Sequence, residues 1–440
     1  MNRTSPAASS AKSTAKSTAK STAAARYPAS RTLLRRAAQV IPGGVWGHNK
    51  FPAVLSPEHY PWFAERGQGA RVQDVDGNWY TDFLCGYGTS VHGYAQPEVD
   101  AAVAEEASRG ECLSQATARS VELAELLVAT VEGAAWAAWG KSGSDATWIA
   151  LLTARAHTGR SLVACVDGAY HGSHGWCAWC NSGAGRDSSD SSAVVTVPWN
   201  DLGALEALFR TRGPQLAAVA ITPFHHPIPG AAELPDPAWL AALREHCDRH
   251  GTLLISDDVR AGFRLDLRGS HAHFGYRPDL VCFSKAIANG WPLAAVTGTD
   301  ALRDAAAEVF AAGTFWNAGS AMAAALASLR LMKRQGTVDV LRARGEQFTS
   351  GLLALARRHR VPLRVSGPPA MPTVTVDGDT EHAWMSRFAI HMTAEGALVH
   401  PTHNWFVSAA HDEAVIEESL DCAARAMQRT QEEREATVPA

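Results

Sequence analysis

Short apolar runs alternate with amphipathic stretches through the middle of the chain, from about residue 134 to residue 298. The apolar runs predict strands at residues 162–166, 194–197, 216–221, 252–256, 280–283 and 294–297. Three of the stretches between them have helical spacing, at residues 145–157, 201–212 and 237–250. Strands interleaved with helices of this length favour an α/β fold, in which helices cover both faces of a mostly parallel sheet.

The two ends of the chain have a different pattern. Helical spacing dominates after residue 314, at residues 319–334, 337–359 and 412–429, with short apolar runs at 372–376 and 397–400. Near the other end, DVDGNWYTDF predicts a hairpin around Asp76 and Gly77. We therefore expect a large domain at residues 85–318 and a smaller α+β domain formed by residues 26–84 and 319–440.

Composition narrows the classes of function. The chain has 440 residues, 46% of them apolar, and a formal net charge of −4, which argues against nucleic-acid binding. No apolar run is long enough to span a membrane, so we expect a cytoplasmic protein. Residues 1–25 contain an AKST unit three times and no acidic residue. We expect a disordered basic tail there, with an organelle transit peptide as the alternative.

Two acidic residues and a lysine follow predicted strands. Asp257 and Asp258 come after the run at 252–256, and Lys285 comes after the run at 280–283. Adjacent side chains on extended backbone point to opposite faces, so at most one of the two aspartates faces a given crevice. In sheets of this kind, ligands bind beyond the carboxyl ends of the strands. We therefore expect one carboxylate and the lysine amine at the same edge.

A turn rich in serine and glycine opens one of the predicted helices. Ser142, Gly143 and Ser144 precede it, and Asp145 lies in its first turn, so several backbone amides there lack helical partners. Such a helix end can bind phosphate. A serine in this place is more often only an N-cap, so both interpretations stay open.

Tyr170 and His171 also follow a predicted strand, the one that ends at residue 166. An aromatic ring there is either a surface beside the phosphate site or part of the core. Together these residue types suit pyridoxal phosphate, which needs an amine for an imine, an acid at its ring nitrogen, amides for its phosphate and a flat side chain against its ring. A lysine beside an apolar strand end and a cationic ring has its charged form disfavoured, so Lys285 becomes a usable nucleophile.

Several longer motifs extend this pattern. In chain order they are VIPGGV, DVDGNWYTDF, SGSDA, YHG, ISDDVRAGFR, PDLVCFSKAIANGWPLAA and GTFWNAGSAMAAA. They resemble the motifs of the class III, fold type I pyridoxal phosphate enzymes, most closely the branch of glutamate-1-semialdehyde 2,1-aminomutase. The resemblance spans nearly the whole chain after the tail. It implies a seven-stranded sheet in the large domain and pyridoxal 5'-phosphate as cofactor.

The resemblance also implies roles around the cofactor ring. Lys285 would form the Schiff base, and Asp257 would pair with the pyridine nitrogen. Val259 would pack on the ring face opposite Tyr170, and His171 would belong to the same cofactor wall.

The phosphate roles follow from the same resemblance. Gly143 and Ser144 would hold the phosphate through backbone amides, with Ser142 in the same turn. Thr314, in GTF, would reach the phosphate of a neighbouring subunit. That last role implies a homodimer with shared active sites.

The chain departs from this family at the expected substrate pocket. Thr222 replaces the glutamate of the family's Glu-Pro pair, and Trp46 and His48 lie in GGVWGHNK, where the aminomutase has GGVNSPVR. A missing carboxylate and a changed entrance argue against the substrate of the mutase. We expect Tyr87, His225 and His226 to shape the pocket as well.

Two histidine-rich segments are further candidates. In HPTHNW, at residues 400–405, His403 and its neighbours either line the substrate pocket or are solvated loop residues. HGSHGWCAWC places His171, His174, Cys177 and Cys180 at a spacing that resembles zinc ligands. Four ligands so close in sequence rarely enclose a tetrahedral ion, and we expect no metal.

These residues predict a pyridoxal phosphate-dependent aminotransferase that moves an amino group from an amino acid or amine donor to a carbonyl acceptor. Intramolecular amino transfer, as in the aminomutase, and epimerisation of an amino acid would use the same residues and stay as alternatives. A protein that binds the cofactor without turnover is the alternative from another class. The presence of both Lys285 and Asp257 argues against it.

Overall fold

The computed structural model describes residues 26–47, 55–176 and 193–437. The predicted tail, His48, Cys177 and Cys180 lie outside the described residues. None of the helices in the described ranges combines the length and the apolar character that crossing a membrane requires.

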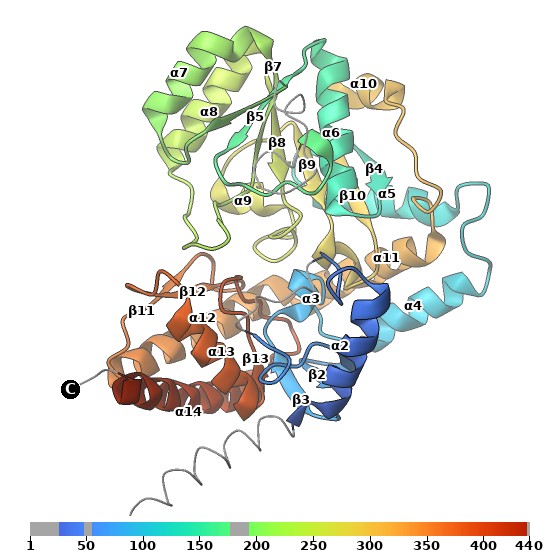
Figure 1. Ribbon diagram of the computed structural model, residues 1–440. Coiled ribbons are helices and arrows are strands. Elements are labelled where there is room, and N and C mark those ends of the chain that lie inside the picture. Colours follow the sequence, from blue (N-terminus) through green and yellow to red (C-terminus); the bar gives the residue numbers. More distant parts are fainter. Residues whose placement is uncertain (1–25, 48–54, 177–192, 438–440) are drawn as a thin grey trace, which may run out of the picture.

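A seven-stranded sheet forms the centre of the larger part of the molecule (Figure 1). Its strands lie in the order β4 (Trp136–Gly140), β10 (Ala294–Gly298), β9 (Leu280–Phe283), β8 (Leu253–Asp257), β7 (Leu216–Ile221), β5 (Leu162–Val166) and β6 (Val194–Val197). Neighbouring strands are parallel except beside β10, which is antiparallel to both β4 and β9. The predicted mostly parallel sheet is confirmed.

Helices cover both faces of this sheet, as Figure 1 shows. On one face lies α6 (Gly143–Thr158), and on the other lie α7 (Leu202–Arg212) and α8 (Pro237–His250). Side chains alternate along β5: Val163 and Cys165 pack towards α6, whereas Ala164 packs towards α7 and α8. Because both faces are covered, the strands are apolar throughout, which is why they are recognisable as continuous runs in the sequence.

The two ends of the chain build the smaller part together (Figure 1). β1 (Ala64–Gln68), β2 (Arg71–Asp74) and β3 (Trp79–Asp82) form an antiparallel sheet, and β13 (Ala397–Leu398) adds to β3 in parallel. The core joins residues from both ends: the rings of Phe83 and Phe348 stack with their centroids 4.4 Å apart. The predicted α+β part from the two ends is confirmed, and its boundaries at residues 84/85 and 318/319 stay predictions.

The remaining elements connect these sheets. Before β4 come α2 (Pro28–Val40), α3 (Cys85–Gly88), α4 (Pro97–Ala107) and α5 (Ala118–Thr130). η4 (Gly213–Gln215) lies directly before β7. Between β7 and residue 335 come α9 (Ser270–Phe274), η5 (Lys285–Ala288), η6 (Asp300–Leu302), α10 (Arg303–Glu308) and α11 (Gly319–Gln335). The C-terminal elements are α12 (Thr337–Arg358), β11 (Leu363–Ser366), β12 (Thr373–Val376), α13 (Ala383–Glu395) and α14 (Glu413–Thr437). Figure 1 shows α11 between the two parts, where it packs on α4, α5 and α12.

A few elements differ from the sequence prediction. The prediction omits β4, because WAAWG has no β-branched residue and its alanines suit a helix equally well. It ends the last helix at residue 429, whereas α14 continues to Thr437. The hairpin between β2 and β3 is confirmed, and Gly77 adopts the positive φ of +88° that its turn requires.

Candidate active site

A cavity of about 630 Å³ lies at the carboxyl ends of the parallel strands. Loops that follow β5, β7, β8 and β9 form its wall, together with the first turn of α6 and a segment of the smaller part near residue 400. Many sequence-predicted site residues line it: Tyr87, Ser142, Gly143, Ser144, Tyr170, His171, Asp257, Val259, Lys285 and His403. The strand-end rule therefore identified the correct edge of the sheet for a cavity.

Strand register brings the lysine and one aspartate to the same edge. β8 and β9 are parallel, with Asp257 opposite Cys282, and Lys285 follows three residues later at the start of η5. Lys285 has a φ of +49°, in the left-handed region that costs a residue with a side chain about 1 kcal/mol. The Ser284 hydroxyl donates to the carbonyl of Leu293 at 2.9 Å and fixes this turn between β9 and β10.

The amine of Lys285 is poised to be neutral near physiological pH. Burial lowers its pKa to about 7, and the positive charge of Arg260 acts in the same direction. The nearby carboxylate of Asp257 opposes both effects without cancelling them. A neutral amine is the form that attacks carbonyl carbon and accepts protons.

Asp257 is held rigidly on the cavity wall. Its Oδ2 lies 2.8 Å from Nδ1 of His171, and its Oδ1 accepts the backbone N–H of Val259 at 3.2 Å. Asp258 points away into the protein, as the alternation of side chains predicts, and accepts the backbone N–H of Ser270 at 2.7 Å. Burial raises the pKa of Asp258 to about 7. Asp257 is therefore the aspartate that faces the cavity.

The first turn of α6 forms the opposite end of the cavity. Ser142 is the N-cap, and its side chain accepts the backbone N–H of Asp145, which in turn accepts the N–H groups of Lys141 and Ser142. The amides of Gly143 and Ser144 open the helix and so have no intrahelical acceptor. Both interpretations of this turn therefore hold: it has an N-cap, and it presents amides at a positive helix end.

Glycine is required at the start of this helix. A β-carbon on Gly143 would lie 2.7 Å from Cγ1 of Val259, which is closer than side-chain carbons approach. The backbone at the start of α6 therefore packs directly against the Val259 side chain in the loop after β8. Tyr170 also lies on the cavity wall. An amine, a carboxylate, helix-end amides and a flat aromatic side chain meet in one cavity, and these residues fit pyridoxal phosphate.

The histidine-rich segment lines the cavity rather than lying in solvent. Nδ1 of His400 accepts the backbone N–H groups of Thr402 and His403, and Nδ1 of His403 donates to the carbonyl of Asn404 at 2.8 Å. Burial lowers the pKa of His400 to about 4 and that of His403 to about 2. Both rings are thus neutral at pH 7. The ring of His403 meets that of Tyr87 edge-on, with the centroids 5.3 Å apart.

Three other predicted residues are not part of this cavity wall. Trp46 is 73% exposed, and its neighbour Gly47 lines the cavity instead. His225 stacks against Trp199, with ring centroids 5.9 Å apart, and the next residue, His226, faces the cavity. Thr314 is exposed in the loop before α11. Its predicted role concerns a neighbouring subunit and stays a prediction.

Sequence reasoning missed Arg260 and assigned no contact to Thr222. Arg260 lies in ISDDVRAGFR at a position to which the family resemblance gives no role, yet it is 8% exposed and lines the cavity. Thr222 also lines the cavity, and its hydroxyl donates to the carbonyl of Phe224 at 2.8 Å. The signal for Arg260 that the sequence offers is a charged residue shortly after the end of a predicted apolar strand.

The histidines considered as zinc ligands have other contacts. His171 contacts Asp257, and Nε2 of His174 lies 3.4 Å from Oδ1 of Asp145. Within the described ranges, no group of three or more potential ligands is placed to hold a metal ion.

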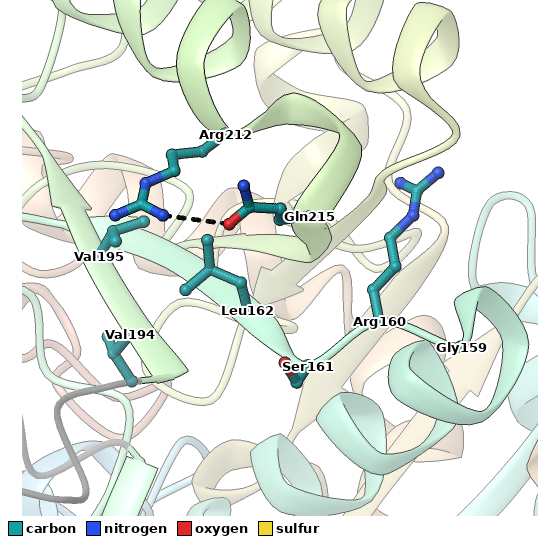
Figure 2. A pocket seen from close by; sticks show the side chains of 8 residues that line it. All are labelled: Gly159, Arg160, Ser161, Leu162, Val194, Val195, Arg212 and Gln215. Carbon is teal, nitrogen blue, oxygen red and sulfur yellow. Dashed lines mark hydrogen bonds between the residues drawn. The ribbon is translucent and has the colours of Figure 1, made fainter.

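A second cavity, of about 480 Å³, lies at the opposite edge of the sheet, where β5 begins (Figure 2). Arg160 donates from Nη1 to the carbonyls of Leu216, His250 and Gly251, and Arg212 donates to Oε1 of Gln215 at 3.1 Å, as the dashed line in Figure 2 shows. The described residues of its wall include no lysine, carboxylate, histidine or cysteine. This cavity lacks the groups that amino-group chemistry needs.

Comparison with known proteins agrees with this site. Residues 54–430 match the family described as aminotransferase class-III. The chain belongs to this family. It is 38% identical over 396 residues to aminopentol aminotransferase of Sphingopyxis macrogoltabida, which covers 90% of this chain and 93% of that protein. It is 33% identical over 430 residues to glutamate-1-semialdehyde 2,1-aminomutase of Chloroflexus aurantiacus, which covers 90% and 96%.

A solved structure supports the same relationship. The FumI protein of a Sphingopyxis species, in its PLP internal aldimine form, superposes with a TM-score of 0.90 at 37% identity, covering 93% of this chain and 98% of that one. The predicted class III membership, fold type I architecture and pyridoxal phosphate cofactor are confirmed. This class III aminotransferase is therefore a pyridoxal phosphate-dependent enzyme, and the roles of its individual residues stay predictions.

The lowered pKa of Lys285 predicts an unusual pH dependence. In the protein without cofactor, an amine-specific acylating reagent should modify Lys285 at a rate that rises with pH and reaches half its plateau near pH 7, because only the neutral amine reacts. Mass spectrometry of the peptide that contains Lys285 measures this rate. The Lys285→Arg protein, which lacks the reactive amine, is the control. A half-point near 10.5, the ordinary lysine value, would contradict the burial argument.

Proposed function

We propose that this aminotransferase uses Lys285 and Asp257 to move an amino group between an amino acid or amine donor and a separate carbonyl acceptor. The observation that carries the proposal is the buried amine of Lys285, with a pKa of about 7, at the same strand edge as Asp257 and open to the cavity. When bound, pyridoxal phosphate supplies an aldehyde that combines with amines and a ring that withdraws electrons from the adjacent carbon.

Different residues of the chain would bind different parts of the cofactor. The Gly143 and Ser144 amides bind the phosphate at the positive end of α6. Asp257, oriented by His171 at 2.8 Å, retains a proton on the ring nitrogen by accepting its hydrogen bond. Tyr170 and Val259 then restrict the ring to one plane.

Lys285 has two tasks in this proposal. Its amine would hold the cofactor through the aldehyde carbon. Once an incoming amino group has taken that place, the amine, neutral near pH 7, would accept the proton that leaves the substrate carbon and donate it again. The same residue acts as holder and as base because burial disfavours its charged form.

Two features favour a separate acceptor over intramolecular transfer. Thr222 lines the cavity where the family's glutamate would stand, and its hydroxyl is occupied by the carbonyl of Phe224. The segment around Trp46 and Gly47 differs from the aminomutase motif, and Gly47 lines the cavity. The 38% identity to an aminopentol aminotransferase also supports transfer between two molecules and makes aminopentol a first donor to test.

We also propose that two copies of the chain form a homodimer in the cytoplasm. Phe310 is 94% exposed and Phe315 is 63% exposed in the loop that carries Thr314. Large apolar side chains grouped at this exposure are typical of a surface that another protein covers. In the described residues no cysteines are joined by a disulfide, which is usual in a reducing compartment.

Separate half-reactions test the proposed activity. A donor added alone should convert the cofactor to its amine form, and a carbonyl acceptor added later should restore the aldehyde form, both followed in the absorbance spectrum. Lys285→Ala should slow the first step roughly 10²- to 10⁴-fold, because the base is lost. Labelled nitrogen that returns to the same molecule without an acceptor would indicate an aminomutase, and inversion without transfer would indicate an epimerase. An unchanged spectrum with every donor would favour a silent binding protein.

Charged substitutions in the exposed loop test the proposed dimer interface. Phe310→Glu together with Phe315→Glu should shift the mass in solution from twice 46.9 kDa to a single chain, because buried carboxylates would oppose association. Light scattering after gel filtration measures the mass. Leu202→Glu, at an apolar position of α7 that is 47% exposed, is the control and should leave the dimer intact. A dimer that survives the double substitution contradicts the placement of the interface.

A further inference from the structure

Arg260 is a buried cation on the wall of the active-site cavity. It follows Val259 in the loop after β8 and is 8% exposed. Its Nη1 donates to Oδ1 of Asn404 at 3.0 Å, and within the part of the chain that the structure describes it forms no ion pair. A neutral amide does not compensate the loss of water around a guanidinium group. Arg260 therefore carries a buried charge that no ion pair among the described residues neutralises.

A second buried arginine on the same loop shows the contrast. Arg264 lies four residues later, is 1% exposed, and donates from Nη1 to the carbonyl of Val407 and from Nη2 to that of Gly88, both at 2.9 Å. Arg264 thus joins the backbone of three segments and does not line the cavity. Arg260 has one such contact and faces open space, so a structural role explains Arg264 but not Arg260.

One carboxylate of the cavity wall, that of Asp257, attracts Arg260 but forms no ion pair with it. Asp257 is the one carboxylate among the described residues that line the cavity, and His171 and the Val259 amide already hold its two oxygens. The surrounding histidines are neutral: burial lowers the pKa of His400 and His403, and burial together with Arg260 lowers that of His226. Among the described residues that line the cavity, Arg260 is therefore the side chain that keeps a full positive charge at neutral pH.

The position of Arg260 identifies the part of the cavity that it serves. Asn404, its partner, belongs to the segment that also supplies His403, whose ring meets Tyr87. Asn404 and His403 come from the smaller part of the molecule, whereas the expected phosphate site lies at the first turn of α6. Arg260 is thus placed where the two parts of the chain meet, on the side expected for the substrate.

We propose that Arg260 binds a carboxylate of the amino acid or keto acid that takes part in the transfer, and so selects partners that carry one. The inference rests on the proposed function. A guanidinium group presents parallel N–H donors that match the two oxygens of a carboxylate. The same charge repels a second ammonium group, so diamines are poor donors for this enzyme.

A pair of ligands that differ only in charge tests this proposal. Holoenzyme is titrated calorimetrically with 3-phenylpropionate and with 3-phenylpropionamide, neither of which has an amino group to transfer. The wild-type protein should bind the acid roughly ten- to hundredfold more tightly than the amide, the usual effect of a hydrogen bond to a charged group. Arg260→Met should abolish that preference. Arg212→Met, which removes a positive charge at the opposite edge of the sheet, is the control and should keep it.

A second variant guards against misfolding. Arg260→Gln retains a donor for Asn404 while it removes the charge, and it should also lose the preference for the acid. A preference that persists in either folded variant overturns the proposal. Weaker cofactor binding with an unchanged preference also overturns it, because Arg260 would then serve an oxygen of the cofactor. The half-reaction assay separates the two proposals: transfer without an acid preference sinks this inference alone, whereas the preference without transfer sinks the proposed function alone.

Discussion

The parallel register of β8 and β9 sets a carboxylate and an amine at one buried edge, and the rest of the site depends on that pairing. Asp257 lies opposite Cys282, and Lys285, which itself adopts a left-handed backbone conformation, follows three residues after Cys282. A shift of β8 by one residue would turn Asp257 into the protein and Asp258 towards the cavity, because successive side chains point to opposite faces. The core on both faces of the sheet prevents such a shift.

Burial then gives each group its chemical state. The amine of Lys285 loses its charge near pH 7 because the surroundings are apolar and Arg260 is close, while Asp257 keeps its place through His171 and a backbone amide. The histidines of the smaller part remain neutral for the same reason. The charge of Arg260 has no ion-pair partner among the described residues, and we infer that the substrate supplies it.

The sequence predicts the large sheet well because its strands are covered on both faces. The observed bounds of β5, β6, β7 and β9 match the predicted bounds. Each apolar run ends where the strand leaves the part of the sheet that helices cover. β4 is not predicted because WAAWG has no β-branched residue. Site residues at strand ends follow from the same pattern, as Asp257, Lys285 and Tyr170 show.

Residues supplied by loops are harder to predict. Whether His225 or His226 faces the cavity depends on one residue of backbone direction, which a single sequence does not reveal. The orientation of Arg260 is set by Asn404, a partner 144 positions later in the chain. Contacts between distant parts of the chain, rather than the local sequence pattern, set the orientation of these side chains. The residues on the substrate side of the cavity could therefore be identified only from the structure.

The central claim is that Lys285 is the residue that holds the cofactor. The most direct measurement is to reduce the holoenzyme with borohydride, digest it, and locate the pyridoxyl group by mass spectrometry. The account predicts the label on Lys285. A label on Lys141 would contradict it, because that lysine precedes the first turn of α6 and its amine is also buried, with a pKa that burial lowers.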